Sequence, residues 1–112
     1  SVIGTPLFMS PEQASGQLSN VDGRSDQYSA ATMLYILLLK HHPHAIETND
    51  YKSIIQKISR GKVRPPRSIK PDFNPELESI LMRALEQRPE DRFPTAGEFA
   101  EALSGFLDKR SG

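Results

Sequence analysis

Gly4-Thr5-Pro6-Leu7-Phe8-Met9-Ser10-Pro11-Glu12 is the most informative segment of the chain. Residues 1–9 combine glycine and proline with no helical period, which predicts an extended loop. Ser10 then suits a helix N-cap, Pro11 the first helical position, and Gln13 completes a capping box. A short helix is therefore expected directly after the loop, and the Ser, Gly and Asn residues of 15–23 should end it.

A long helix should follow, beginning at Ser25 or Asp26 and running to about Lys40, before His41-His42-Pro43 ends it. Its apolar residues fall on every face, with an unbroken apolar run from Met33 to Leu39. A helix of this kind has to be buried by partners on several sides. The rest of the chain supplies few such partners, so we expect part of this helix to remain uncovered.

Three amphipathic helices are predicted in the second half of the chain, from apolar stripes over residues 51–58, 77–85 and 99–107. Gly61 ends the first, Asn74-Pro75 starts the second, and Thr95 with Glu98 forms a capping box for the third. The proline-bearing segment 62–73 reads as a surface loop, and no strand alternation stands out. The fold class expected is all-α, as one unit over residues 1–112.

Composition narrows the class of protein. The 112 residues carry 14 basic and 14 acidic side chains, so electrostatics give no case for nucleic acid or an anionic membrane. There is no cysteine, which excludes disulfides and thiolate metal sites. The longest apolar run is far shorter than a bilayer span, so no membrane segment is expected in this chain. The expected location is cytoplasmic, and a membrane tether of the parent protein outside this segment stays open.

Two further motifs join the opening segment in a recognisable order. They are Ser25-Asp26-Gln27-Tyr28-Ser29 and Arg88-Pro89-Glu90-Asp91-Arg92-Phe93. With residues 4–12, they resemble the second half of a bacterial-type (Hanks-type) serine/threonine protein kinase domain, and the resemblance covers nearly the whole chain. It implies the helical C-terminal lobe of a kinase, from the end of the activation segment onward.

The resemblance also implies roles for particular residues. Gly4, Thr5, Pro6, Leu7, Phe8 and Met9 would form the substrate-recognition loop, where the Thr5 hydroxyl would favour serine and threonine substrates. Glu12 and Arg92 would form a buried structural ion pair, and Asp26 would anchor the catalytic loop. Each role has a simpler alternative. Glu12 and Arg92 would be two unrelated surface charges, Thr5 a turn residue before proline, and Asp26 a helix cap.

The cluster His41, His42 and His44 invites a metal hypothesis, but its spacing around Pro43, the lack of a carboxylate ligand pattern within the turn and the lack of cysteine favour a solvated loop instead. The hydrophobe common in the family at the position of His44 is absent, which predicts looser packing of this loop. No metal ligand set is expected in the chain.

Phosphoryl transfer needs groups that cover the phosphates, hold magnesium and accept a proton. The sequence contains no Gly-x-Gly-x-x-Gly, His-Arg-Asp or Asp-Phe-Gly, and in the family these lie before the segment matched here. We therefore expect no catalytic residue and no cofactor in this chain, with ATP and Mg bound by an intact parent domain whose N-terminal lobe is absent here. Its partners would be a protein substrate carrying Ser or Thr and the upstream part of the kinase domain. The alternative is a non-enzymatic helical interaction module, binding a partner through the helix at Tyr51–Ile58 or the exposed face of the long helix.

Overall fold

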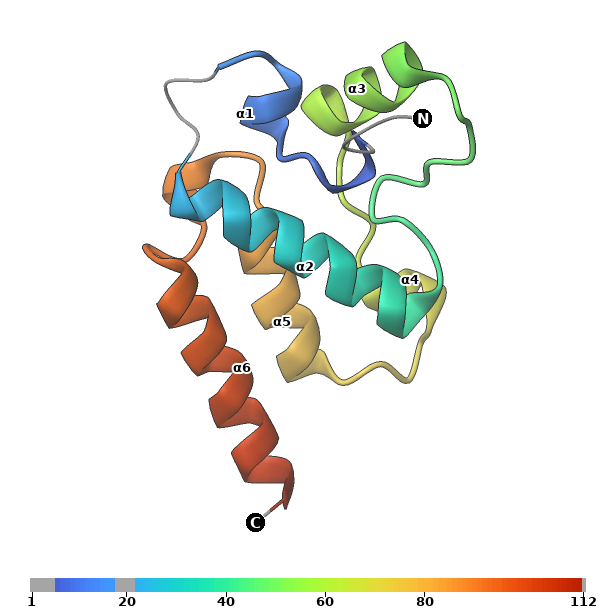
Figure 1. Ribbon diagram of the computed structural model, residues 1–112. Coiled ribbons are helices and arrows are strands. Elements are labelled where there is room, and N and C mark those ends of the chain that lie inside the picture. The colour runs from blue at the N-terminus through green and yellow to red at the C-terminus, as the bar shows by residue number, and fades with distance from the viewer. Residues whose placement is uncertain (1–5, 18–21, 112) are drawn as a thin grey trace.

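The computed structural model describes residues 6–17 and 22–111, and it is helical throughout, with no strand in those ranges (Figure 1). The elements are the 3₁₀ turn η1 (Pro6–Phe8), α1 (Pro11–Ala14), α2 (Gly23–Leu39), α3 (Tyr51–Arg60), α4 (Pro66–Ile69), α5 (Pro75–Ala84), η3 (Pro89–Asp91) and α6 (Ala96–Ser111). The all-α prediction is confirmed.

Helix α2 is the centre of the molecule. Helices α1 and α3 pack together on one side of it, and α5 and α6 pack together on the other (Figure 1). It contacts η1, α4, α5 and α6 directly, so segments from both ends of the chain meet on its surface. This arrangement places the loop before α1 between α2 and α3.

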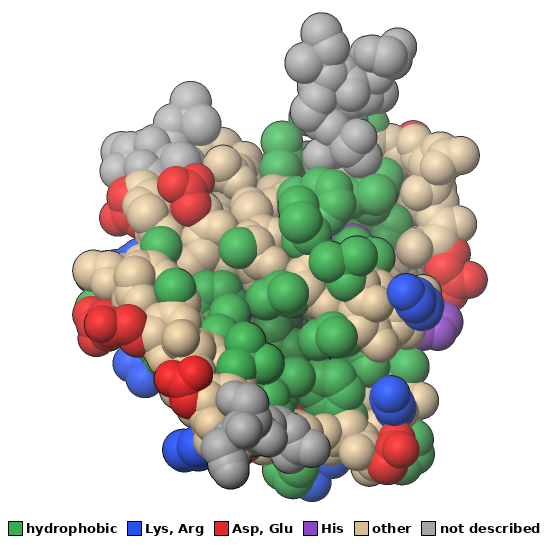
Figure 2. All heavy atoms as spheres, turned by 60° about the horizontal axis from the view of Figure 1, so that its bottom comes forward, with side chains coloured by type: hydrophobic (Ala, Val, Ile, Leu, Met, Phe, Trp, Pro, Cys, Tyr) green, Lys and Arg blue, Asp and Glu red, His purple; other side chains and the backbone are tan. Residues whose placement is uncertain are grey.

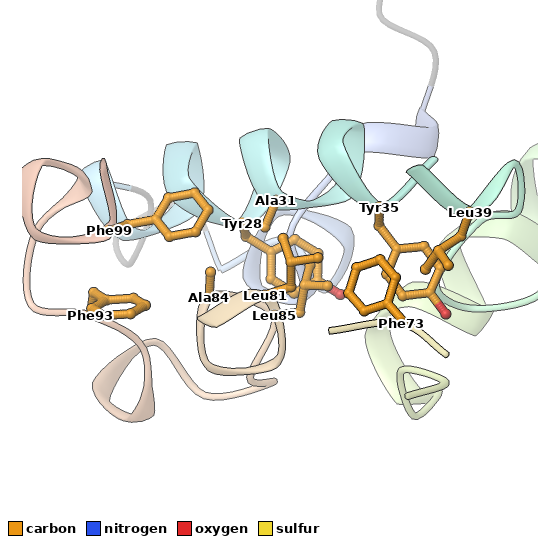
Figure 3. Packing of buried hydrophobic residues seen from close by; sticks show 10 residues of the cluster. All are labelled: Tyr28, Ala31, Tyr35, Leu39, Phe73, Leu81, Ala84, Leu85, Phe93 and Phe99. Carbon is orange, nitrogen blue, oxygen red and sulfur yellow. The ribbon is translucent and has the colours of Figure 1, made fainter. Parts of the chain in front are cut away.

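The core runs along the face of α2 that looks toward α5 (Figure 3). Tyr28, Ala31, Tyr35 and Leu39 recur at helical spacing on this face and are buried. They pack with residues contributed by the loop before α5, by α5 and its end, and by the region around α6: Phe73, Leu81, Ala84, Leu85, Phe93 and Phe99. Burying aromatic and branched side chains of this size contributes about 1.5–3 kcal/mol each, so this seam dominates the stability of the fold.

The helix ends mostly follow the local sequence. The Ser10 hydroxyl accepts a hydrogen bond from Gln13 N, and the Gln13 side chain bonds back to Ser10 N, as the capping box predicts. Asn74 Oδ1 accepts hydrogen bonds from the backbone of α5, and Thr95 Oγ1 accepts one from Glu98 N. The predicted starts of α1 and α5 are thus confirmed.

Three expectations about local structure are wrong. Helix α2 begins at Gly23 rather than at Ser25 or Asp26, because the Asp22 carboxylate accepts a hydrogen bond from Arg24 N and caps the helix earlier. Segment 62–73 contains α4 and buries Phe73 in the core, so it is not simply a surface loop.

The third concerns the histidine loop that follows α2. His42 and His44 are only 8% and 6% exposed, so they are neither solvated nor loosely packed. His41 alone is exposed. His42 Nε2 lies 2.7 Å from the carbonyl of Leu7, and His44 Nε2 lies 2.5 Å from the hydroxyl of Tyr28, so each buried ring contacts a distant segment of the chain.

Candidate functional site: the loop before α1 and its anchors

A buried ion pair between Glu12 and Arg92 holds together the elements around the site. Arg92 Nη1 lies 2.7 Å from Glu12 Oε2, and Nη2 lies 2.8 Å from Oε1, so the guanidinium and the carboxylate form two parallel hydrogen bonds. The two residues are 2% and 4% exposed. The structure therefore brings together two side chains that lie at opposite ends of the chain.

The remaining donors of Arg92 are also used. Nε donates to the carbonyl of Glu86, Nη1 to that of Arg24, and Nη2 to that of Gln87. The guanidinium carbon lies 4.8 Å from the centroid of the Tyr28 ring, within the range of a cation–π contact. Since arginine has five N–H donors, a buried position with every donor paired is physically stable here.

Glu12 has a second partner in α2, because Ser25 Oγ donates a hydrogen bond of 2.5 Å to Oε2. Burial alone would raise the pKa of Glu12, but the hydrogen bonds from Arg92 and Ser25 outweigh it, and the pKa is lowered overall. The carboxylate is therefore ionised at neutral pH and holds α1 against the start of α2.

Gln27 makes a related connection that the sequence did not reveal. Its side-chain amide donates to Phe93 O at 2.9 Å and accepts from Phe93 N at 3.0 Å, and the residue is almost fully buried. Gln27 thus satisfies the backbone of the residue next to Arg92. The only sequence signal was its place within the motif of residues 25–29.

The backbone of the loop before α1 is held by contacts from α2 and from the loop that follows α2. Ser29 Oγ donates to the carbonyl of Phe8 at 2.5 Å, and His42 Nε2 lies 2.7 Å from the carbonyl of Leu7. Leu7, Phe8 and Met9 are half-buried, so their side chains remain partly accessible. Gly4 and Thr5 lie outside the described residues, as does the side chain of Pro6.

Asp26 is exposed on the first turn of α2, and Asp22 rather than Asp26 caps that helix. It lies at one end of a shallow apolar groove between α2 and α6, lined by Ala30, Met33, Leu34, Phe99, Ala100 and Leu103. Met33 and Leu37 are 52% and 58% exposed. Figure 2 shows a side of the molecule on which hydrophobic side chains gather into a broad patch.

The described residues contain no cluster of three or more His, Cys, Asp or Glu able to hold a metal ion. Within the same ranges, no helix is long and apolar enough to cross a membrane. The site is therefore a loop whose backbone is held by hydrogen bonds and whose side chains are partly accessible. A buried ion pair fixes the helix that follows the loop.

Comparisons with known proteins show what the chain is similar to. No family model matches the chain. The chain is 41% identical over 108 residues to the tyrosine-protein kinase MasK of Myxococcus xanthus, covering 96% of this chain and 16% of that protein. It is 38% identical over 103 residues to the serine/threonine-protein kinase PknB of Mycolicibacterium smegmatis, covering 92% of this chain and again 16% of the relative.

Among solved structures, the chain is similar to the kinase domain of PknI from Mycobacterium tuberculosis, with a TM-score of 0.68 and 28% sequence identity. The match covers 92% of this chain and 36% of that domain. The chain therefore spans about one sixth of the length of the curated relatives. Over the segment that it spans, it belongs to the bacterial Hanks-type serine/threonine protein kinases, as the helical C-terminal lobe.

Proposed function

We propose that the chain is the substrate-recognition and scaffold portion of an ATP-dependent serine/threonine protein kinase. The observation that carries the proposal is the anchoring of the loop at residues 7–9. Its backbone is fixed by Ser29 and His42, and it continues directly into α1, where the buried Glu12–Arg92 pair holds the chain. A loop with a fixed backbone and half-buried side chains suits recognition of an extended peptide.

The exposed apolar face of α2 supports a second part of the same proposal. Asp26, Ala30 and Met33 lie along this face with no covering element among the described residues. Exposed apolar side chains that gather on one face are typical of an interface. We propose that the upstream part of a kinase domain covers it, with its catalytic loop bonded to the Asp26 carboxylate.

The chain on its own should be inactive, because the sequence carries none of the phosphate-covering, magnesium-holding or base motifs of the family. This is measured by thermal melting with and without excess Mg-ATP. Binding at one hundred times the dissociation constant would add about 2.7 kcal/mol of stability. We expect no change in the melting temperature, and a clear rise would contradict this part of the proposal.

The positive test is a chimera in which residues 1–112 replace the matched segment of the PknB kinase domain of Mycolicibacterium smegmatis. We expect Mg-ATP-dependent phosphorylation of peptides carrying serine or threonine. Tyrosine peptides belong in the same assay, because the relative MasK is a tyrosine-protein kinase. A chimera that melts cooperatively but phosphorylates nothing would overturn the proposal and favour a non-enzymatic interaction module.

The alternative function, a non-enzymatic interaction module, has fewer exposed apolar surfaces available for a partner than the sequence suggested. Ile54 and Ile58 of α3 are buried within the chain itself, and Tyr51 is the exposed large hydrophobic residue of that helix. In residues 6–17 and 22–111, three of the five exposed large hydrophobic side chains lie on α2, so its exposed face is the surface best suited to such a partner.

A further inference from the structure

A run of basic residues begins in α3 and continues beyond it. Residues 51–71 contain seven basic residues and no acidic one, in a chain whose formal net charge is zero. Within residues 6–17 and 22–111, Arg67 is the one of the seven that forms an ion pair, with Glu78. The seven are Lys52, Lys57, Arg60, Lys62, Arg64, Arg67 and Lys70.

Three of these cations lie around the histidine loop after α2. Lys57 Nζ donates to the carbonyl of Ala45 at 2.9 Å, and Arg64 Nη2 donates to the carbonyl of His42 at 2.7 Å. Lys62 lines a small cavity beside the same loop. We call Lys57, Lys62 and Arg64 the cationic rim.

The cationic rim lies beside the loop at residues 7–9. His42, whose carbonyl accepts from Arg64, also has its Nε2 2.7 Å from the carbonyl of Leu7. Helix α3, which carries Lys57, packs against η1. A single residue therefore connects the Arg64 guanidinium to the loop proposed for substrate recognition.

The charge of the rim is not neutralised by ion pairs within the described part of the chain. Lys57 and Lys62 are exposed, and no rim residue pairs with a carboxylate there. Arg64 Nε also has no hydrogen-bond partner among the described residues. The rim therefore has the capacity to bind an anionic group from outside the chain.

The titratable neighbours leave this excess of positive charge in place. Burial lowers the pKa of both His42 and His44, and the charges of Arg64 and Lys57 lower them further, so the two rings are neutral at neutral pH. Glu86 is the carboxylate that lines the same cavity as Lys62. Three cations and one carboxylate give this surface a net positive charge.

The surroundings of the rim favour a peptide over other polyanions. No aromatic side chain lies between Tyr51 and Phe73, whereas single-stranded nucleic acid binds on stacking aromatic residues. Ile54 and Ile58 of α3 are buried in the fold, so they are not free to enter a lipid surface. Carboxylates on a flexible segment need only reach exposed ammonium and guanidinium groups.

We propose that the cationic rim is a docking surface for an acidic segment of a protein substrate, beside the loop at residues 7–9. The docking itself stands alone, whereas the statement that the segment belongs to a substrate rests on the proposed function. An extended peptide advances by about 3.3–3.6 Å per residue, so Asp or Glu a few positions from the residue on the loop can reach the rim. Complementary charge of this kind selects among peptides more than it adds affinity.

The test is the binding of a fluorescein-labelled hexaglutamate peptide to the 112-residue chain, measured by fluorescence anisotropy at low salt. Hexaglutamate should bind saturably and hexaglutamine should not. About 0.3 M NaCl should weaken the binding, because salt screens exposed charges. The double variant Lys57→Gln with Lys62→Gln should bind about three- to tenfold more weakly, since one exposed ion pair changes an equilibrium by up to about fivefold.

Two further variants make the test specific. Lys70→Gln with Lys109→Gln removes the same amount of charge from exposed positions outside the rim, and should bind like the unmodified chain. Lys62→Glu leaves the bond from Lys57 to Ala45 in place, and should weaken binding of hexaglutamate while favouring a hexalysine peptide.

Equal weakening in the rim variant and in its charge-matched control would overturn the proposal, because the peptide would then respond only to total charge. Absence of hexaglutamate binding would overturn it too. So would tighter binding, through the same residues, of a single-stranded RNA oligonucleotide or of phosphatidylserine vesicles.

No phosphoryl transfer enters the binding measurement, so an inactive chimera would remove the proposed function and leave the docking surface intact. In an active chimera, the double variant of the rim should raise KM for serine peptides with glutamate flanks and leave kcat unchanged. An unchanged KM would overturn the link between the rim and the substrate.

Discussion

Arg92 and Glu12 are joined by two parallel hydrogen bonds of 2.7 and 2.8 Å inside the protein, although 80 positions separate them in sequence. The pair fixes the relative positions of α1, the start of α2 and the turn at η3, since Ser25 and the carbonyls of Arg24, Glu86 and Gln87 bond to the same two side chains. A loop whose end is fixed in this way can present its side chains to a peptide without an ordering cost at each binding event.

Removing Arg92 should therefore be severely destabilising. Arg92→Ala leaves the Glu12 carboxylate buried without its partner and should lower the free energy of unfolding by about 3–5 kcal/mol. The double variant with Glu12→Gln should recover part of this loss. Urea denaturation measures both, with Arg88→Ala as the control, because the Arg88–Glu90 pair is exposed and should be worth less than about 1 kcal/mol. Equal losses for Arg92→Ala and Arg88→Ala would mean that the buried pair contributes no more stability than an exposed one.

Removing the Gln27 amide should lower the free energy of unfolding nearly as much as removing Arg92. Gln27→Leu keeps a similar volume but leaves both the N–H and the carbonyl of Phe93 unpaired, each buried polar group costing about 1–3 kcal/mol. Its free energy of unfolding should therefore fall well below that of Gln56→Leu, a change on the exposed side of α3. A loss under about 0.5 kcal/mol for Gln27→Leu would show that water replaces the missing bonds.

The contrast between Gln27 and Ser10 explains how much the sequence could predict. Capping boxes and apolar stripes are local, so the helix starts at Ser10 and Asn74 and the end at Gly61 could be predicted from neighbours within one turn. Gln27 bonds to a residue 66 positions away, and no local pattern carries that information. The Glu12–Arg92 pair was expected only through the family resemblance.

The prediction that the loop after α2 is solvated was wrong for the same reason, because its histidines have long-range partners. Histidine and proline in a short connection are typical of an exposed loop, yet His42 bonds to Leu7, 35 positions earlier, and His44 to Tyr28, 16 positions earlier. The start of α2 was misplaced because both Asp22 and Asp26 suit a cap, and only the backbone geometry decides between them. Polar residues with long-range partners are the part of this fold that local chemistry does not determine.

Lys40 ends α2 with a φ of 62°, in the left-handed region that a side chain disfavours. Lys40→Gly should relieve that strain and raise the free energy of unfolding by up to about 1 kcal/mol, because its exposed side chain makes no core contact. The matched control is Gln56→Gly within α3, which should lose about 1 kcal/mol. Denaturant midpoints compare the two, and a destabilised Lys40→Gly would show that this lysine contributes more than its backbone costs.

Stability should depend on pH through His44. Its folded pKa of about 4 lies below the unfolded value near 6.5, so the unfolded chain binds the proton more readily. The stabilisation is present above pH 6.5 and is lost as pH falls toward 4, by about 2 kcal/mol between pH 7 and pH 5. His42 acts in the same direction, and Glu12, with a lowered pKa, adds its loss only below pH 4.5.

Urea denaturation at pH 7 and pH 5 measures this dependence. His44→Phe removes the titrating ring and should lose most of the difference between the two pH values, whereas His41→Gln should keep it. A difference that persists unchanged in His44→Phe would assign the acid sensitivity to another group.

The uncovered face of α2 should make this chain self-associate or bind hydrophobic dyes. Met33, Leu37 and Leu38 are 52%, 58% and 43% exposed, an unusual density of apolar surface on a single helix. Replacing Met33 and Leu37 by Gln should reduce light scattering and dye fluorescence, while changing the free energy of unfolding by less than about 1 kcal/mol, since neither side chain is in the core. Leu81→Ala, at a fully buried position, is the control and should cost about 2–5 kcal/mol. If the unmodified chain is a sharply melting monomer that binds no dye, the face does not need a cover, and the proposed interface with an upstream kinase segment loses its support.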